Sequence, residues 1–194
     1  AAALAALAAV IKPQFGILIP LVAVIALVRA RRSGDAWLVA LVGLTGAAVV
    51  SVAALPFGLT LVDVIQRVGE AAATYPYLSV NAWNLWALAD SDGKGIILNG
   101  GWGSDTVPLF GFGPPALFIG TLMLVAAIGV AVWAARHDER TRTVAALALI
   151  AIAFFVLPTR VHERYLFPAV PLTIALAAAL PGWRLAAVLT GVVL

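Results

Sequence analysis

Long runs of apolar residues alternate with short polar links along the whole chain. A membrane-spanning helix needs about 20 apolar residues to cross a hydrocarbon core of about 30 Å, so these runs predict membrane helices. In chain order they cover residues 1–28 with a break at Pro13, 36–57, 115–135, 144–158, 165–180 and a run that begins at Leu185. The sequence therefore predicts an all-α integral membrane protein with about six transmembrane segments.

The two ends of the sequence lie within apolar runs. We therefore expect the first and last transmembrane segments to be truncated and the natural protein to extend beyond both ends. No internal repeat, heptad or low-complexity linker divides the chain. The prediction is a single membrane domain fragment over residues 1–194.

The composition agrees with a membrane protein. Of the 194 residues, 63% are hydrophobic and 11% are charged, whereas a soluble domain has about 25% charged residues. A water-soluble core is thereby excluded. The net charge of +3 comes from few charged residues and does not imply nucleic-acid binding. The absence of cysteine excludes disulfides, thiol nucleophiles and thiolate metal sites.

Arginines gather in three short links between the apolar runs. The links contain Arg29, Arg31 and Arg32, then Arg136, Arg140 and Arg142, and finally Arg184. Seven of the 12 Lys and Arg residues are therefore in these links, which the positive-inside rule assigns to the cytoplasm. Tryptophans beside the links and in the long opposite loop fit an aromatic belt at each interface. We expect His137, Asp138 and Glu139 of the second link to be solvated.

The opposite, extracytoplasmic side contains one long loop, residues 58–114. Within it, residues 60–73 place apolar side chains on one helical face and polar ones on the other. Thr60 can cap this helix, and Asp63 with Arg67 forms an i,i+4 pair. We expect the helix to lie flat on the membrane surface; the alternative is that it packs on its own loop.

Three polar clusters fall on this extracytoplasmic side: Lys12-Pro13-Gln14, residues 75–86, and residues 159–165. Lys12 precedes Arg29 by 17 positions, or about 25 Å of helix. Lys12 is thus expected at or just below the outer boundary. Pro13 breaks the helix there, which a membrane tolerates only where protein or water surrounds the backbone.

The third cluster lies closest to the membrane. Residues 144–180 give about 55 Å of helix for two crossings that need about 60 Å, so no length remains for a projecting loop. Arg160, His162, Glu163 and Arg164 are therefore expected at the membrane rim. One glutamate against two arginines leaves a positive surplus, which suits a phosphate. For His162, a structural bond to a carbonyl or to Glu163 is an equal alternative.

Simpler roles remain open for single members of these clusters. Snorkelling explains Lys12 alone, and helix capping or turn formation explains Asn81 and Asn84. Ordinary interfacial anchoring explains Arg160 and Arg164. The coincidence of all of them on one side favours a shared site.

Other motifs are weak. Residues 90–95 read Asp-Ser-Asp-Gly-Lys-Gly, but they lack the third oxygen ligand and the final Glu of a calcium-binding EF-hand loop. The glycine-rich stretches match neither a P-loop nor a dinucleotide fingerprint, and two histidines make a zinc site of the common type unlikely. We predict no metal site from these residues.

Three motifs together resemble a known family. They are Lys12-Pro13-Gln14, Asn81-Ala82-Trp83-Asn84-Leu85-Trp86 and His162-Glu163-Arg164-Tyr165. In this order and on one side of the membrane, they resemble polytopic glycosyltransferases of the GT-C superfamily, with mannosyltransferase-like and protein-mannosyltransferase-like members. The resemblance covers about residues 8–180 and implies a GT-C-like fold in a prokaryotic plasma membrane.

The resemblance implies an inverting transfer of sugar from a polyprenyl-phosphate donor to an extracytoplasmic lipid, glycan or protein. The residues implied to bind the lipid phosphate are Lys12, Arg160, His162 and Arg164. Those implied to shape the pocket are Gln14, Asn81, Asn84, Glu163 and Tyr165. The family's catalytic base is an acidic residue of the first outer loop, which we expect upstream of residue 1. No cofactor is evident, although the superfamily allows a divalent metal.

Two other classes of protein remain alternatives. A lipid or solute transporter or flippase also has proline-broken segments and intramembrane charges, but it predicts polar residues near the midplane of several helices. A non-catalytic membrane subunit would pack through small residues such as Gly43, Gly46 and Ala47.

Overall fold

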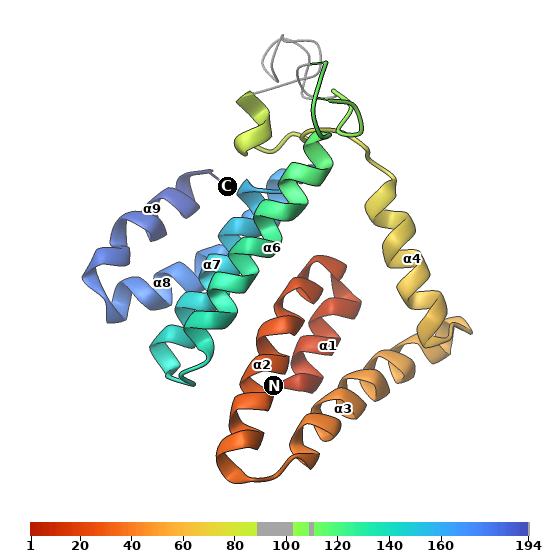
Figure 1. Cartoon of the computed structure of the whole chain (residues 1–194), viewed down its shortest axis with the longest axis vertical. Helices are drawn as coiled ribbons and strands as arrows, with labels where there is room; N and C mark the ends of the chain where they lie inside the picture. Colours follow the sequence, from red (N-terminus) through yellow and green to blue (C-terminus); the bar gives the residue numbers. More distant parts are fainter. Residues whose placement is uncertain (89–102, 109–110, 194) are drawn as a thin grey trace. The chain divides into compact units, whose positions relative to one another are not determined.

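The computed structural model describes residues 1–88, 103–108 and 111–193 (Figure 1). It is 76% helical, and its described part contains only isolated β-bridges rather than strands. The α-helices are α1 (Ala2–Ile11), α2 (Ile19–Ser33), α3 (Trp37–Ala54), α4 (Leu61–Ala73), α6 (Ala116–Ala135), α7 (Arg140–Val156), α8 (Ala169–Ala179) and α9 (Arg184–Val193). The predicted all-α class is confirmed.

Within the described residues, three helical segments are long and apolar enough to cross a membrane: Pro13–Ser33, Trp37–Phe57 and Ala116–Ala135. The second is almost wholly exposed, since 6% of its most apolar window is buried. Such an apolar surface fits a lipid environment. Helix α7 has 17 residues, α8 has 11 and α9 has 10, fewer than the roughly 20 needed to span. The remaining transmembrane segments and the GT-C-like arrangement stay predictions.

The chain divides into two compact units. Unit 1 comprises Ala1–Ala73 and Val132–Ala146, and unit 2 comprises Thr74–Ala131 and Leu147–Leu194.

In unit 1, α1, α2 and α3 lie side by side (Figure 1). Lys12 ends α1 in an extended conformation (φ −142°) because the following Pro13 disfavours helix at this position. A short 3-10 segment, Pro13–Leu18, then leads into α2. The predicted break of the first apolar run at Pro13 is thus present.

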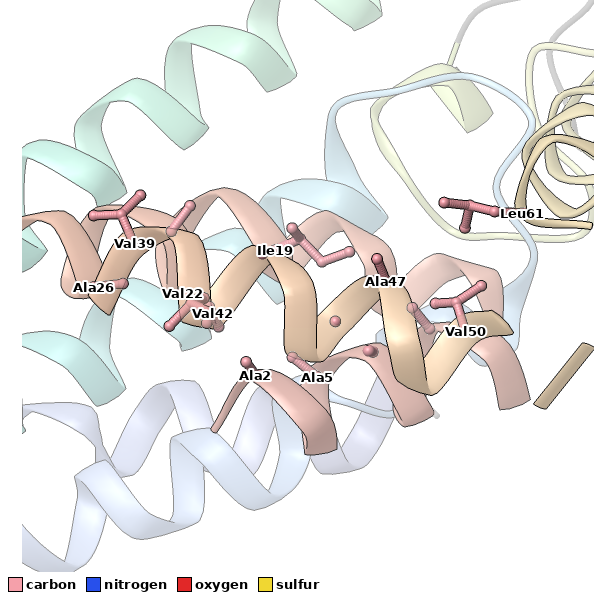
Figure 2. Close-up of a pocket in the computed structure, with 15 residues that line it drawn as sticks. Ala2, Ala5, Ile19, Val22, Ala26, Val39, Val42, Ala47, Val50 and Leu61 are labelled. Atoms are coloured by element: carbon pink, nitrogen blue, oxygen red, sulfur yellow. The ribbon is translucent and has the colours of Figure 1, made fainter. Parts of the chain in front are cut away.

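The three helices and Leu61 surround a hollow of about 400 Å³ (Figure 2). Its lining is apolar throughout, and Gly43 and Gly46 of α3 form part of it. A Cβ atom added to either glycine would meet no described atom within 4 Å. These glycines therefore leave open space beside α3 rather than allowing a close contact within the described chain.

An ion pair joins the end of α2 to the turn between α6 and α7, also in unit 1. Arg29 donates from Nε to Asp138 Oδ2 at 3.0 Å and from Nη2 to Oδ1 at 3.1 Å. Arg32 donates to the carbonyl of His137 at 3.0 Å. The bidentate pairing lowers the pKa of the Asp138 carboxyl. Our expectation of a merely solvated turn was wrong for Asp138, whose side chain is 15% exposed.

Helix α4, Leu61–Ala73, lies where the sequence predicted a helix over residues 60–73, and it begins with reciprocal capping. Thr60 Oγ1 accepts from the Asp63 N–H at 3.2 Å, while the Asp63 carboxylate accepts from the Thr60 N–H at 2.7 Å. The expected Asp63–Arg67 ion pair does not form, because the Asp63 carboxylate turns back to Thr60. Ile65 and Val68, on the predicted apolar face, are exposed.

Unit 2 contains most of α6 and α7 and all of α8 and α9. Its buried core joins α7 to the turn that follows it, through Ala82, Ala151, Phe155, Val161, Leu166 and Ala169. Helices α8 and α9 pack together (Figure 1) and share a hydrogen bond between the hydroxyls of Thr173 and Thr190 at 3.0 Å. Buried hydroxyls in apolar helices are satisfied in this way.

Gly120 of α6 provides a test of this packing. A Cβ atom there would lie 2.8 Å from the Leu157 carbonyl oxygen and 3.1 Å from Pro158 Cα. We expect Gly120→Ala to lower the free energy of unfolding by about 1–3 kcal/mol through overpacking, measured by thermal unfolding in detergent. The matched control is Gly129→Ala in the same helix, where nothing lies within 4 Å. Equal stability of both variants would contradict the packing described here.

Candidate functional site

The second and third polar clusters meet in unit 2. We call residues 74–88 and 103–108 the cap segment, and residues 157–166 the α7–α8 turn. The backbone N–H of Val80 donates to the Val161 carbonyl at 2.9 Å, and the backbone N–H of Arg160 donates to the Tyr77 carbonyl at 3.0 Å. Bridges also pair Val80 and Asn81 with His162. The backbone of the cap segment is thus hydrogen-bonded to the backbone of the α7–α8 turn.

The end of α7 explains part of this docking. Pro158 cannot continue the helix, and the last carbonyls of a helix need partners from elsewhere. The Trp86 indole donates to the Leu157 carbonyl at 2.7 Å, and Asn84 donates to the Pro158 carbonyl at 3.4 Å. Side chains of the cap segment therefore satisfy backbone groups at the end of α7.

Asn84 is occupied by this structural role. Its side chain is buried, and its Oδ1 accepts the Trp86 N–H at 3.1 Å, closing a local turn. Asn81 differs, because its side chain is exposed and its backbone is left-handed, with φ 61°. Of the two predicted pocket asparagines, Asn81 is the one open to a ligand.

A buried ion pair fixes the cap segment to the turn. Asp105 has no exposed surface, and its Oδ2 accepts from Arg160 Nε at 2.7 Å and from the Thr159 hydroxyl at 2.7 Å. Its Oδ1 accepts from Arg160 Nη2 at 3.1 Å. The Asp105 backbone also donates to Pro76 and accepts from Leu117. The Asp105–Arg160 ion pair holds Arg160 in a left-handed backbone conformation, with φ 64°. Residues other than glycine rarely adopt this conformation.

Asp105 changes the charge balance of the cluster. Counting Arg160 and Arg164 against Glu163 predicted a positive surplus, but Asp105 adds a second carboxylate and removes it among the described residues. The Nε and Nη2 edge of Arg160 donates to the Asp105 carboxylate, so that edge is not available to a phosphate. The predicted phosphate role of Arg160 stays a prediction.

His162 lies in an aromatic group. Its ring centroid is 5.3 Å from that of Tyr75, edge to face, and 5.4 Å from that of Tyr165. Tyr165 in turn stacks on Phe154 at 5.8 Å. Burial and the nearby Arg164 lower the pKa of His162, and Glu163 partly offsets this. In the described part of the chain its ring makes neither of the hydrogen bonds that we considered, to Glu163 or to a carbonyl.

Glu163 and Arg164 are exposed at the start of the following 3-10 segment, Glu163–Leu166. Among the described residues, Arg164 forms no ion pair. With Tyr75, Asn81 and His162 beside them, these side chains form a polar surface with an accessible cation. Such a surface can hold an anionic group through a bidentate guanidinium contact.

The first polar cluster belongs to unit 1. Lys12 is half-buried at the break between α1 and the next segment. The Gln14 amide nitrogen is buried and has no hydrogen-bond partner in the described residues, and such a donor is costly to leave unsatisfied. Both residues remain predicted site members.

The calcium-like stretch, residues 90–95, lies outside the described residues. Within the described ranges, no group of three or more His, Asp or Glu side chains could hold a metal ion.

Sequence reasoning missed Asp105, which stands alone in a Ser104-Asp105-Thr106 stretch with no motif around it. The only available signal was the apparent surplus of arginine at the membrane rim, where charged groups are usually paired. The surplus indicated that a further carboxylate was needed to balance the charge, but the sequence did not indicate which residue supplies it.

Comparison with known families, with characterised proteins and with solved structures finds no match for this chain. The resemblance to GT-C glycosyltransferases therefore rests on the short motifs alone.

Asp105→Asn tests the buried ion pair. Leaving Arg160 without its carboxylate should lower the free energy of unfolding by about 3 kcal/mol, since a half-buried charge loses its partner. Thermal unfolding in detergent measures this loss, and faster amide exchange in residues 74–88 should accompany it. Asp35→Asn is the control, because Asp35 is exposed and forms no ion pair in the described chain. Unchanged stability of Asp105→Asn would refute a structural role for the pair.

Proposed function

We propose that this chain is part of a GT-C-like glycosyltransferase that moves a sugar from a polyprenyl-phosphate donor to an acceptor at the extracytoplasmic face of a prokaryotic plasma membrane. The main support is the docking of the cap segment on the α7–α8 turn, which brings two of the three family-like motifs together. Segments about 80 positions apart in the sequence thus form one polar surface next to apolar helices.

In this proposal the two arginines of the turn have different tasks. Arg160 pairs with Asp105 and positions the turn. Arg164 is exposed and binds the donor phosphate, so that it stabilises the negative charge that grows on the departing polyprenyl phosphate. Glu163, Asn81 and Tyr165 shape the pocket around the sugar.

The proposed reaction is a direct displacement at the anomeric carbon. The acceptor hydroxyl attacks the carbon, the bond to the phosphate oxygen breaks, and the configuration inverts. A carboxylate takes the hydroxyl proton. Asp105 is unsuited to this step because it is fully buried and already accepts three hydrogen bonds. The resemblance instead implies an acidic residue of the family's first outer loop as the base.

A non-catalytic membrane subunit is the second candidate, and one observation favours it. Gly43 and Gly46 line an apolar hollow, and no described atom lies near the position of an added Cβ. Small residues with free space beside them allow a helix of another protein to approach closely. Such a subunit would not need the exposed side chains of the α7–α8 turn.

Substitution in the full-length protein separates these candidates. We expect Arg164→Ala to reduce sugar transfer from polyprenyl-phosphate mannose or glucose at least about 100-fold, because a charge-assisted contact to the leaving phosphate is lost. His162→Ala should abolish transfer likewise. Arg164→Lys keeps the charge without the bidentate contact and should retain part of the activity. Transfer of radiolabelled sugar in reconstituted vesicles measures all three.

The control is Arg67→Ala, which removes an exposed arginine of α4. It should leave transfer unchanged, and thermal unfolding should show that every variant is folded. Wild-type transfer by both Arg164→Ala and His162→Ala would reject the proposed site. Absence of any transfer by the wild-type protein with the donors named would favour the subunit.

A further inference from the structure

Two of the three arginine-rich links come together in unit 1. The Arg29–Asp138 ion pair joins the end of α2 to the turn between α6 and α7 at 3.0 Å. The arginines gathered in this way are Arg29, Arg31, Arg32, Arg136, Arg140 and Arg142. All six are exposed. We call them the arginine surface.

The arginine surface keeps a positive surplus after internal pairing. Its six arginines stand against three carboxylates in the same links, Asp35, Asp138 and Glu139. Asp138 forms ion pairs with Arg29 and Arg32, and Glu139 forms one with Arg142 at 2.7 Å. This leaves a net charge of +3 on the links.

Arg31 and Arg140 form no ion pair among the residues that the structure describes. Arg31 is in the last turn of α2, where the helix dipole favours a cation. Arg140 is the first residue of α7, whose first turn contains no acidic residue. A cation at that position opposes the helix dipole, and an external anion would offset this repulsion.

The surface also has the features of a membrane interface. Trp37 begins α3 and Trp133 lies in the last turn of α6, and both are largely exposed. Arg136 lies over the Trp133 ring, with its guanidinium carbon 4.4 Å from the centroid. Tryptophan at the ends of apolar helices marks the headgroup level of a bilayer. We therefore expect the arginine surface at the depth of lipid phosphates.

We propose that the arginine surface binds the headgroups of anionic phospholipids. Clustered arginines beside membrane helices attract such lipids, and the guanidinium fork matches a phosphate. The positive-inside rule accounts for arginines on one side of a membrane. It does not require two links to be drawn together while three of their arginines, Arg31, Arg136 and Arg140, form no ion pair among the described residues. This proposal is independent of the glycosyltransferase assignment and concerns other residues.

The test compares phosphatidylglycerol with phosphatidylcholine on the purified full-length protein in detergent micelles. Native mass spectrometry counts the bound lipids, and thermal unfolding reports the stabilisation that binding gives. We expect phosphatidylglycerol to bind more tightly than phosphatidylcholine. Only phosphatidylglycerol should raise the Tm. The double variant Arg31→Gln, Arg140→Gln should bind phosphatidylglycerol about 30-fold more weakly, from about fivefold per arginine.

Three controls make the test decisive. Arg31→Lys with Arg140→Lys keeps both charges and should retain most of the binding. Arg67→Gln removes an arginine outside this surface and should change nothing. Since Arg31 and Arg140 form no described ion pair, the glutamine variant should unfold at the wild-type temperature without added lipid. Equal binding of the two lipids by the wild type, or full phosphatidylglycerol binding by the glutamine variant, would overturn the proposal.

Discussion

The structure of unit 2 depends on the burial of one carboxylate. Asp105 is removed from solvent, and a buried charge is tolerated only with a partner and full hydrogen bonding. Arg160 and Thr159 meet that requirement, and they thereby fix the cap segment against the end of α7. His162, the exposed Glu163 and Arg164, and Tyr165 follow directly in the sequence. Their placement therefore follows from the position of the Asp105–Arg160 ion pair.

Backbone hydrogen bonding imposes the second constraint. Prolines follow the ends of α1 at Ile11, α7 at Val156 and α8 at Ala179, and each interruption leaves carbonyl groups that lipid cannot satisfy. At the end of α7, the partners are the side chains of Trp86 and Asn84. An apolar helix that ends early therefore requires a polar segment from elsewhere in the chain.

The sequence predicted those features that depend on local pattern. The apolar runs located the helices within a few residues, and Pro13 and Thr60 marked a break and a cap that the structure contains. Features that depend on distant partners were not predictable. Asp138 was expected to be solvated because nothing near it in the sequence indicates Arg29, and Asp105 gave no signal for the same reason. The membrane sidedness, the number of spans and the role of Arg164 still rest on pattern and resemblance.

The Arg29–Asp138 pair bears on how such a chain enters a membrane during synthesis. Its two members are 109 positions apart, and unit 1 is built from two separate stretches of the sequence. Domains otherwise tend to form from the amino terminus as the chain emerges. Here Arg29 and Arg32 of α2 cannot meet Asp138 until α6 and the turn that follows it have been synthesised. A polytopic chain of this kind completes its first unit only after much of its second has been made.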